Sequence, residues 1–498
     1  MGVVRRQSIL SGILIYAGFA IGALNILVLF QRHLTPEQIG LTRILLDVGM
    51  VLSAVFGLAA VPLVQRFSPF YQSYLPERRN DLPFLTLALG AVGCLMLFLL
   101  LPRVEPWMVR KFGARSPLFV HHFDLVYPLT ASLVFFAILE AHAWSRKRTV
   151  LSNGLKEFGY RLLTTGLILT FIAGGIDFDT FIKVYAWLWW PGVVVLAIVL
   201  RRAGALGLHP VPSRVTRRVG GRMVTYGGVL LGAVILNIVA RTNDTIILAS
   251  QSAGGLADAA VFTIATYLVT VMDVPQRSLV SISTPFIAEA WKDGDMARIA
   301  RLYRKTSLNL MLAGIAIFAV VLLNLEDLTD YMGPGYGALT LLVVVSGLGK
   351  MADLSTGLNT QVLLLSRHWR ADFMTNVMLV ALSIPLNYWL TRRYNVMGPA
   401  YGNLIALFVF NGVRLGLIWH FFRLQPFSGE HLKGLGLGLA ALLAGWVVPP
   451  TGSLAADVCL RSAVFALAFG AGVLRFRVST DLREVVDGVR ARLRRNGP

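Results

Sequence analysis

The chain has 498 residues, of which 56% are apolar and 14% are charged. This composition excludes a disordered chain, a coiled coil and an ordinary water-soluble enzyme. The 46 Lys and Arg residues outnumber the 26 Asp and Glu residues and give a net charge of +20. Most of this excess lies in short loops between apolar runs, so it predicts contact with anionic membrane lipids and no nucleic-acid partner.

The apolar runs have the length that crosses a bilayer, which is about 20 residues. Each is expected to be a helix, because lipid forces every backbone polar group to pair within its own segment. We therefore predict an all-α polytopic membrane protein. Its fourteen spans are residues 8–30, 39–64, 83–101, 123–143, 150–173, 180–200, 223–250, 258–286, 306–324, 337–365, 371–390, 398–421, 433–448 and 457–474.

Basic loops predict the orientation of these spans, because Lys and Arg stay on the cytoplasmic side. With the N-terminus inside, the inside segments hold most of the 46 basic residues, so both termini are predicted to be cytoplasmic. The basic linker from Arg201 to Arg222 divides the chain. The predicted parts are an N-terminal lobe at 1–205, a C-terminal lobe at 206–425, two further spans at 426–474 and a basic amphipathic tail at 475–498.

Several short motifs are interpreted as ordinary surface features. Asp177–Phe178–Asp179 has the form of a metal-nucleotide-sugar site but falls in a short external loop, so a solvated turn is favoured. His121–His122 has no matching ligand cluster in the sequence, and Cys94 and Cys459 fall inside apolar runs. We predict no metal, no cofactor and no disulfide framework.

Charged residues inside the spans are more informative. A charge at mid-bilayer costs about 2.5–3.5 kcal/mol, so it normally faces a cavity or a partner. The embedded cations are Arg43, Lys156, Arg161, Lys183, Arg241, Arg277, Lys350, Arg414 and Arg461. Helical spacing predicts six intrahelical pairs, which are Arg43–Asp47, Glu157–Arg161, Arg241–Asp244, Asp273–Arg277, Lys350–Asp353 and Asp457–Arg461. Such a pair can ease insertion or line a cavity, and the sequence leaves both readings open.

Arg414 stands apart from the other embedded cations. It has no acidic residue within a helical turn, and Asn411 lies one turn before it on the same face. We therefore interpret Arg414 as the best candidate for an unpaired cation that faces an anionic ligand. The full set of candidate ligand-binding residues is Arg414, Lys350, Arg241, Arg43, Arg161 and Asn411.

Several segments carry a family resemblance. They are Arg6–Gln7–Ser8, Leu34–Gly40, Ser68–Pro69–Phe70, Gly347–Asp353, Ser366–Asp372, Asn387 and Gly398–Pro399–Ala400. With them the chain resembles the polysaccharide-export flippases (Wzx-type oligosaccharide flippases) of the multidrug/oligosaccharidyl-lipid/polysaccharide exporter superfamily.

That resemblance implies two six-helix lobes around a central cavity, with alternating access. It also implies a transporter that moves an undecaprenyl-pyrophosphate-linked oligosaccharide from the inner to the outer leaflet of the bacterial inner membrane. A polysaccharide polymerase and glycosyltransferases would be its partners. Embedded arginines suit this substrate, because a guanidinium offers forked donors to phosphate oxygens.

The energy source and the substrate class leave alternatives. The membrane potential favours outward transfer of an anion by about 2.3 kcal/mol per charge per 100 mV. Proton or sodium counter-transport is equally open, with Asp47, Asp244 and Asp353 as coupling groups. The rival functions are a cation-coupled drug exporter or a peptidoglycan-precursor-lipid exporter of the same superfamily. A membrane-embedded glycosyltransferase or ligase is disfavoured by the short external loops.

Overall fold

The structure, a computed structural model, describes residue 14 and residues 17–146, 148–207 and 209–479. Those residues form helices joined by short turns and contain no strand. Ten of the helices are long and apolar enough to cross a membrane, and a pair bent by 46°, Gly255–Thr270 with Asp273–Val280, would make an eleventh span. The predicted all-α, multi-pass membrane fold is thus confirmed.

The chain forms two compact units, Met1–Thr263 and Ile264–Pro498. The helices of the first unit are η1 (Asn25–Leu29), α2 (Phe30–His33), α3 (Pro36–Phe56), α4 (Ala60–Tyr74), η2 (Glu77–Arg79), α5 (Leu82–Phe112), α6 (Pro117–His121), η3 (Phe123–Leu125), α7 (Val126–Ser145), α8 (Thr149–Asn153), η4 (Gly154–Gly159), α9 (Tyr160–Ile172), α10 (Phe178–Trp187), α11 (Trp190–Arg202) and α12 (Arg214–Gln251). Helix α13 (Gly255–Thr270) carries the chain into the second unit.

The helices of the second unit are α14 (Asp273–Asp293), α15 (Met296–Leu323), α16 (Leu325–Met332), η5 (Pro334–Tyr336), α17 (Leu339–Ser355), α18 (Asn359–Leu364), α19 (Trp369–Tyr394), α20 (Met397–Phe422), α21 (Gly429–Trp446) and α22 (Leu454–Arg475). The predicted lobe boundaries after residues 205 and 425 stay predictions.

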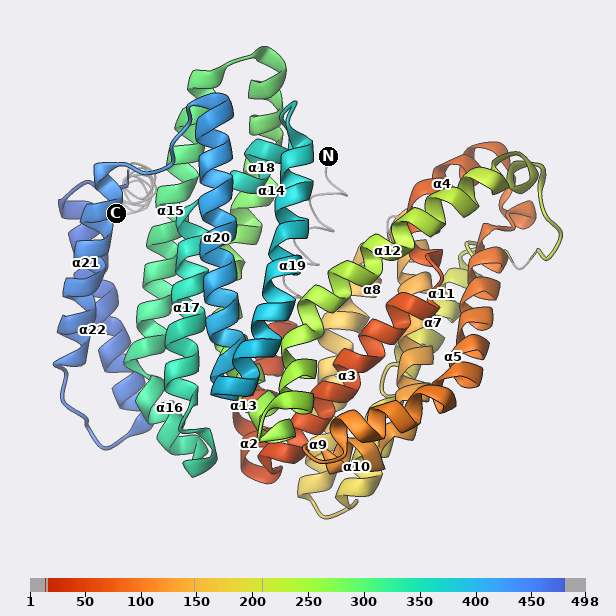
Figure 1. The fold of residues 1–498 in the computed structure, drawn as a ribbon, viewed down its shortest axis with the longest axis horizontal. Helices are drawn as coiled ribbons and strands as arrows, with labels where there is room; N and C mark the ends of the chain where they lie inside the picture. The colour runs from red at the N-terminus through yellow and green to blue at the C-terminus, as the bar shows by residue number, and fades with distance from the viewer. Residues whose placement is uncertain (1–13, 15–16, 147, 208, 480–498) are drawn as a thin grey trace, which may run out of the picture. The chain divides into compact units, whose positions relative to one another are not determined.

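Helix α3 lies at the centre of the first unit and packs against α7 and α12 (Figure 1). It begins at Pro36 because Thr35 caps it: the Gln38 amide donates to the Thr35 hydroxyl, and the Gln38 side chain accepts from the Thr35 amide. This reciprocal capping box satisfies backbone groups that a helix start leaves unpaired. Fully buried Ile44 and Leu45 anchor α3 in the core.

The second predicted span, residues 39–64, is a pair of helices with a break between them. Helix α3 ends at Phe56 and α4 begins at Ala60. Between them Leu58 and Ala59 have φ values of 46° and 58°, in the left-handed region. Left-handed backbone stops a right-handed helix. Pro62 follows in the first turn of α4, and its ring excludes a helical carbonyl at Leu58, four residues earlier.

The predicted count of fourteen spans is not confirmed. Residues 8–13, 15 and 16 of span 8–30 lie outside the described residues, and the described part of the span is helical. Span 150–173 falls on α8, η4 and α9, which carry Lys156, Glu157 and Arg161. Span 433–448 falls on α21, a helix of 18 residues with charged and imidazole groups in its first two turns. The predicted tail at 475–498 lies outside the described residues after Ser479.

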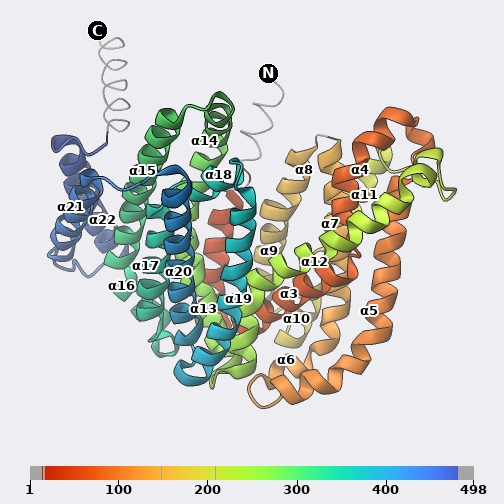
Figure 2. The ribbon, with the colours of Figure 1, turned by 45° about the horizontal axis from the view of Figure 1, so that its top comes forward.

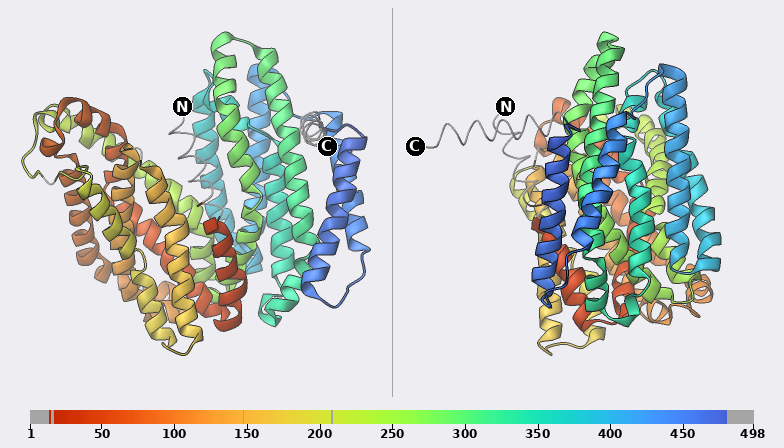
Figure 3. Two further views of the ribbon diagram at one scale, coloured as in Figure 1. Left: turned by 180° about the vertical axis from the view of Figure 1, so that it is seen from behind. Right: turned by 90° about the vertical axis from the view of Figure 1, so that its left-hand side faces the viewer.

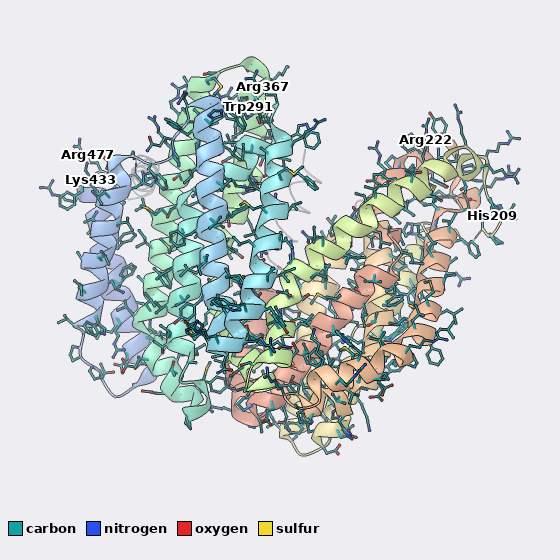
Figure 4. The ribbon with its side chains drawn as sticks, in the orientation of Figure 1. His209, Arg222, Trp291, Arg367, Lys433 and Arg477 are labelled. Atoms are coloured by element: carbon teal, nitrogen blue, oxygen red, sulfur yellow. The ribbon has the colours of Figure 1, made fainter. Side chains whose placement is uncertain are left out.

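In the second unit, α17 packs between α15 and α20, and α19 packs along α20 (Figure 2). The hairpin of α21 and α22 packs mainly on α15 (Figure 3). Ile315 and Phe465 lie in the shared core, and Met351 of α17 packs against it. Lys433 and Arg477 lie at one end of this hairpin, and in the first unit Arg222 lies in the N-terminal part of α12 with His209 in the loop before that helix (Figure 4).

Close helix packing in the first unit depends on Gly93 of α5. A Cβ atom at Gly93 would lie 1.7 Å from the carbonyl oxygen of Phe56. We expect Gly93→Ala to lower the free energy of unfolding by about 1–3 kcal/mol, because the two backbones must separate. The measurement is thermal unfolding of the purified protein in detergent.

Gly166→Ala is the matched control for that substitution. Gly166 lies in α9, where no atom of the described neighbouring elements is within 4 Å of an added Cβ. Alanine is the better helix former, so this change should be neutral or slightly stabilising. Equal losses of stability in the two variants would contradict the packing explanation.

A second prediction concerns the start of α21. His431 is buried there; its Nδ1 accepts from the Ser428 amide at 3.1 Å, and its Nε2 lies 3.0 Å from the Ser307 hydroxyl. Burial lowers the pKa of His431 below its usual value near 6.5. The unfolded chain therefore binds a proton first as the pH falls through about 6.5, and stability declines below that pH.

His431→Gln should weaken this pH dependence, because the glutamine does not titrate. The measurement is the melting temperature of both proteins at one pH above and one pH below the usual histidine pKa. An equal acid-induced fall in the wild type and the variant would assign the effect to other groups.

Candidate functional site

Several embedded polar and charged residues of the second unit form one connected network. It runs from α14 through α17 and α20 to α18 and α19, and it contains Lys350, Asp353, Asn411 and Arg414 of the predicted set. We call this set of contacts the second-unit network. Four predicted residues from distant parts of the sequence are therefore brought together.

Lys350 occupies one end of the second-unit network. Its Nζ lies 2.5 Å from Asp273 Oδ1 on α14 and 3.0 Å from Asp353 Oδ2 on α17. It also donates to Gln276 Oε1 at 2.9 Å. The Lys350 side chain remains 19% exposed. Lys350 is therefore a partly exposed cation between two carboxylates.

Asn411 joins the two ends of the network. Its side-chain amide donates to Asp353 Oδ1 at 3.4 Å. Its Oδ1 accepts from Asn359 Nδ2 at 2.9 Å and from Thr356 Oγ1 at 3.1 Å. Because the amide offers donors and acceptors together, Asn411 couples the acidic group on α17 to the segment that holds Arg414.

Arg414 is not an unpaired cation, and that interpretation is corrected. Its side chain is 1% exposed, and its Nη2 forms an ion pair with Asp372 of α19. Nε donates to Thr375 Oγ1 at 3.0 Å, and the guanidinium lies 4.1 Å from the centre of the Phe410 ring. The partner acid lies on a neighbouring helix, where spacing along the Arg414 helix could not reveal it.

The first unit holds a second polar group around Arg43. Its Nε donates to Asp47 Oδ2 at 2.8 Å, as the spacing predicts, and Thr245 of α12 donates to the same oxygen. Asp47 is fully buried, whereas the Arg43 side chain is 34% exposed. Asp47 Oδ1 has no hydrogen-bond partner among the described residues. Arg43 thus presents an accessible guanidinium, and Asp47 is a buried carboxylate with one unused oxygen.

Arg161 also keeps an accessible face. Its Nη2 lies 3.2 Å from Glu157 Oε2, which confirms the predicted pair, and its side chain is 25% exposed. Arg241 is exposed on α12, and Asp244 on the same helix is half-buried. The Arg241–Asp244 pair stays a prediction.

Sequence reasoning missed several partners of the embedded cations. Asp372 and Gln276 were absent from the candidate set, yet they bind Arg414 and Lys350. Arg461 Nη1 lies 2.7 Å from Asp327 Oδ2, whereas the predicted partner was Asp457. Asp457 accepts from the Thr451 amide and hydroxyl instead. An acidic residue inside an apolar segment is the signal that could have identified such partners.

The exposure of their side chains divides these cations into two classes. Arg414 is fully enclosed by protein donors and acceptors, so an incoming anion would first have to displace Asp372. Arg43, Arg161, Arg241 and Lys350 each retain exposed side-chain surface. The first class holds helices together, and the second class has side-chain surface that the described protein residues do not cover.

Comparison with solved structures identifies membrane proteins of similar fold. A lipid II flippase MurJ in an inward closed conformation matches with a TM-score of 0.74 at 14% identity, over 96% of this chain and 100% of that chain. An inward-facing multidrug resistance transporter of the MATE family and MOP superfamily matches with a TM-score of 0.59 at 16% identity, over 82% of this chain and 93% of that chain.

A third match is the Vibrio cholerae MATE transporter VcmN in its bent form, with a TM-score of 0.53 at 14% identity, over 85% of this chain and 98% of that chain. Comparison of the sequence with protein-family models and with curated proteins gave no match. The predicted polysaccharide-flippase subtype stays a prediction. Together with its membrane-spanning helices, these similarities show that the chain is a multi-pass membrane protein with the transporter fold of MurJ and the MATE proteins.

Proposed function

We propose that this protein is an alternating-access transporter that flips a polyprenyl-pyrophosphate-linked oligosaccharide from the inner to the outer leaflet of the bacterial inner membrane. The observation that carries the lipid-linked part of the proposal is the similarity to a lipid II flippase over 96% of the chain. The oligosaccharide head group is proposed from the family resemblance of the sequence. MATE transporters match a smaller share, 82% and 85%. A lipid-linked substrate therefore has more support than a soluble drug, and a transporter has more than a membrane-embedded glycosyltransferase or ligase.

The accessible cations suit the head group of such a lipid. A pyrophosphate needs several donors in a water-poor environment, and charge-assisted hydrogen bonds are about twice as strong as neutral ones. Arg43, Arg161 and Arg241 of the first unit, and separately Lys350 of the second unit, are each proposed as such a donor. The lipid tail would stay in the bilayer, while a polymerase and glycosyltransferases would act before and after transport.

Three acidic groups are proposed to couple transport to an ion. Asp47 is buried with one oxygen unused, and Asp353 shares Lys350 with Asp273. Asp244 is half-buried on α12. Each could exchange a proton or sodium ion as its surroundings change during the cycle. The membrane potential alone remains the alternative driving force.

A second candidate substrate is the peptidoglycan-precursor lipid. It is favoured by one specific observation, which is that the MurJ structure is described as a lipid II flippase. Both substrates share a polyprenyl pyrophosphate and differ in the attached glycan. The two candidates therefore need a direct comparison.

The test is transport into reconstituted vesicles with three labelled substrates. They are a pyrophosphate-linked oligosaccharide, a peptidoglycan-precursor lipid and a cationic drug. We expect the first to cross fastest in protein-containing vesicles and to stay in its original leaflet in protein-free vesicles. Faster transport of the precursor lipid would select the second candidate, and transport of the drug alone would reject both lipid substrates.

A further inference from the structure

Two sequence motifs from different loops meet in the first unit. His121 ends α6, His122 follows it directly, and Asp179 lies in the first turn of α10. One ligand atom from each of these side chains lies within 4.8 Å of the others. Imidazole nitrogens and a carboxylate oxygen are ligands that Zn²⁺ and related divalent ions accept.

The tautomer of His122 points to a cation at this place. Its Nδ1 lies 3.0 Å from the carbonyl oxygen of Leu118, which can only accept, so Nδ1 carries a proton. In the neutral ring Nε2 is then an acceptor. This Nε2 lies 3.2 Å from Asp179 Oδ1, which is also an acceptor. Two lone pairs at this separation require a proton or a metal ion between them.

The spacing suits a metal ion. Zinc binds nitrogen and oxygen ligands at about 2.0–2.2 Å, so neighbouring ligand atoms in a tetrahedral site lie roughly 3.3 Å apart. The 3.2 Å separation of His122 and Asp179 meets this requirement. His121 is exposed and can rotate to supply the third ligand, which leaves a fourth position for water.

Neighbouring groups orient these ligands. The Leu118 carbonyl fixes the His122 ring, as an outer-shell partner of a metal-binding histidine usually does. Lys183 Nζ lies 2.5 Å from Asp179 Oδ2, the second oxygen of that carboxylate, so Oδ1 is left facing His122.

We infer that His121, His122 and Asp179 form a binding site for a divalent transition-metal ion of the zinc type. The ion would connect the segment after α5 to the start of α10 and so fix two elements of the first unit at one end of the helix bundle. This site is independent of the proposed transport substrate, because it involves none of the embedded cations assigned to the pyrophosphate.

The test is titration of Zn²⁺ alone into the purified full-length protein in detergent, followed by calorimetry and by thermal unfolding. We expect one ion to bind and to raise the melting temperature, with reversal by a chelator. His121→Ala and Asp179→Asn should each weaken the affinity about tenfold or more. Both residues keep exposed surface, so these variants should fold, and size-exclusion profiles will check this.

His420→Ala is the matched control, because His420 is an exposed histidine on α20 in the second unit. This variant should bind Zn²⁺ with the affinity of the wild type. Wild-type protein that binds no Zn²⁺ would overturn the inference. Equal affinity in the wild type, His121→Ala and Asp179→Asn would also overturn it, because the bound ion would then lie elsewhere.

Discussion

Asp372→Ala is expected to lower the free energy of unfolding by about 3–5 kcal/mol, the cost of leaving a buried charge without its partner. Arg414 is 1% exposed, so water cannot replace the missing carboxylate. The remaining contacts with Thr360 and Thr375 are neutral acceptors and only partly compensate. Loss of one acid should therefore loosen the packing of α18, α19 and α20 together.

The measurement is denaturant or thermal unfolding in detergent, with Glu289→Ala as the matched control. Glu289 forms an exposed ion pair with Arg298, and such pairs contribute about 0–1 kcal/mol. The double variant Asp372→Leu/Arg414→Met should recover most of the lost stability, because it removes both charges. A change of less than about 1 kcal/mol for Asp372→Ala would show that Arg414 does not depend on this pair.

Lys350→Gln is expected to slow lipid transport about tenfold or more, because a hydrogen bond to a charged group contributes about 1.5–3 kcal/mol. The same change removes the cation between Asp273 and Asp353 and should also destabilise the second unit. Lys350→Arg keeps the positive charge and should retain more transport than Lys350→Gln.

A double variant separates these two effects. Lys350→Gln/Asp273→Asn removes one charge of each sign and leaves the proposed coupling group Asp353 intact, so it should regain stability over Lys350→Gln. If Lys350 binds the substrate, transport by the double variant stays low although the protein is again stable. Recovery of both properties would assign Lys350 a structural role alone. Transport is measured in vesicles that contain matched amounts of folded protein.

The positions of the helices could be predicted, because the length and apolar composition of a segment indicate a membrane span. The described part of each predicted span falls mainly on helix. The interruptions were missed although the sequence signals them. Pro62 stands four residues after Leu58, at the break between α3 and α4, and Pro275 stands four residues after Val271, at the 46° bend between α13 and α14. A proline ring excludes the helical carbonyl four residues before it, so these prolines mark both breaks.

Ion pairs within one helix could be predicted from the sequence, whereas ion pairs between helices could not. Arg43–Asp47, Glu157–Arg161 and Lys350–Asp353 could be predicted, because helical spacing alone brings these groups together. The pairs Arg414–Asp372, Lys350–Asp273 and Arg461–Asp327 join different helices. They require knowledge of which helices are neighbours, which one sequence does not contain.

The histidine and aspartate cluster was missed for a related reason. His121–His122 and Asp179 lie in separate loops, and each motif alone is typical of a solvent-exposed turn. The fold brings α6 and α10 together, and Leu118 then sets the direction of the His122 ring. A ligand set built from two loops becomes visible when the contacts between those loops are known.

The most direct test of the proposed function is the dependence of lipid transport on the accessible cations. We would measure transfer of a pyrophosphate-linked oligosaccharide in vesicles for the wild type, Arg161→Gln/Arg241→Gln and the control Lys433→Gln. Lys433 is exposed and pairs with Glu430 at the start of α21. We predict wild-type transport by the control and a loss of about tenfold or more in the double variant. Equal transport by all three folded proteins would contradict recognition of the pyrophosphate by these arginines.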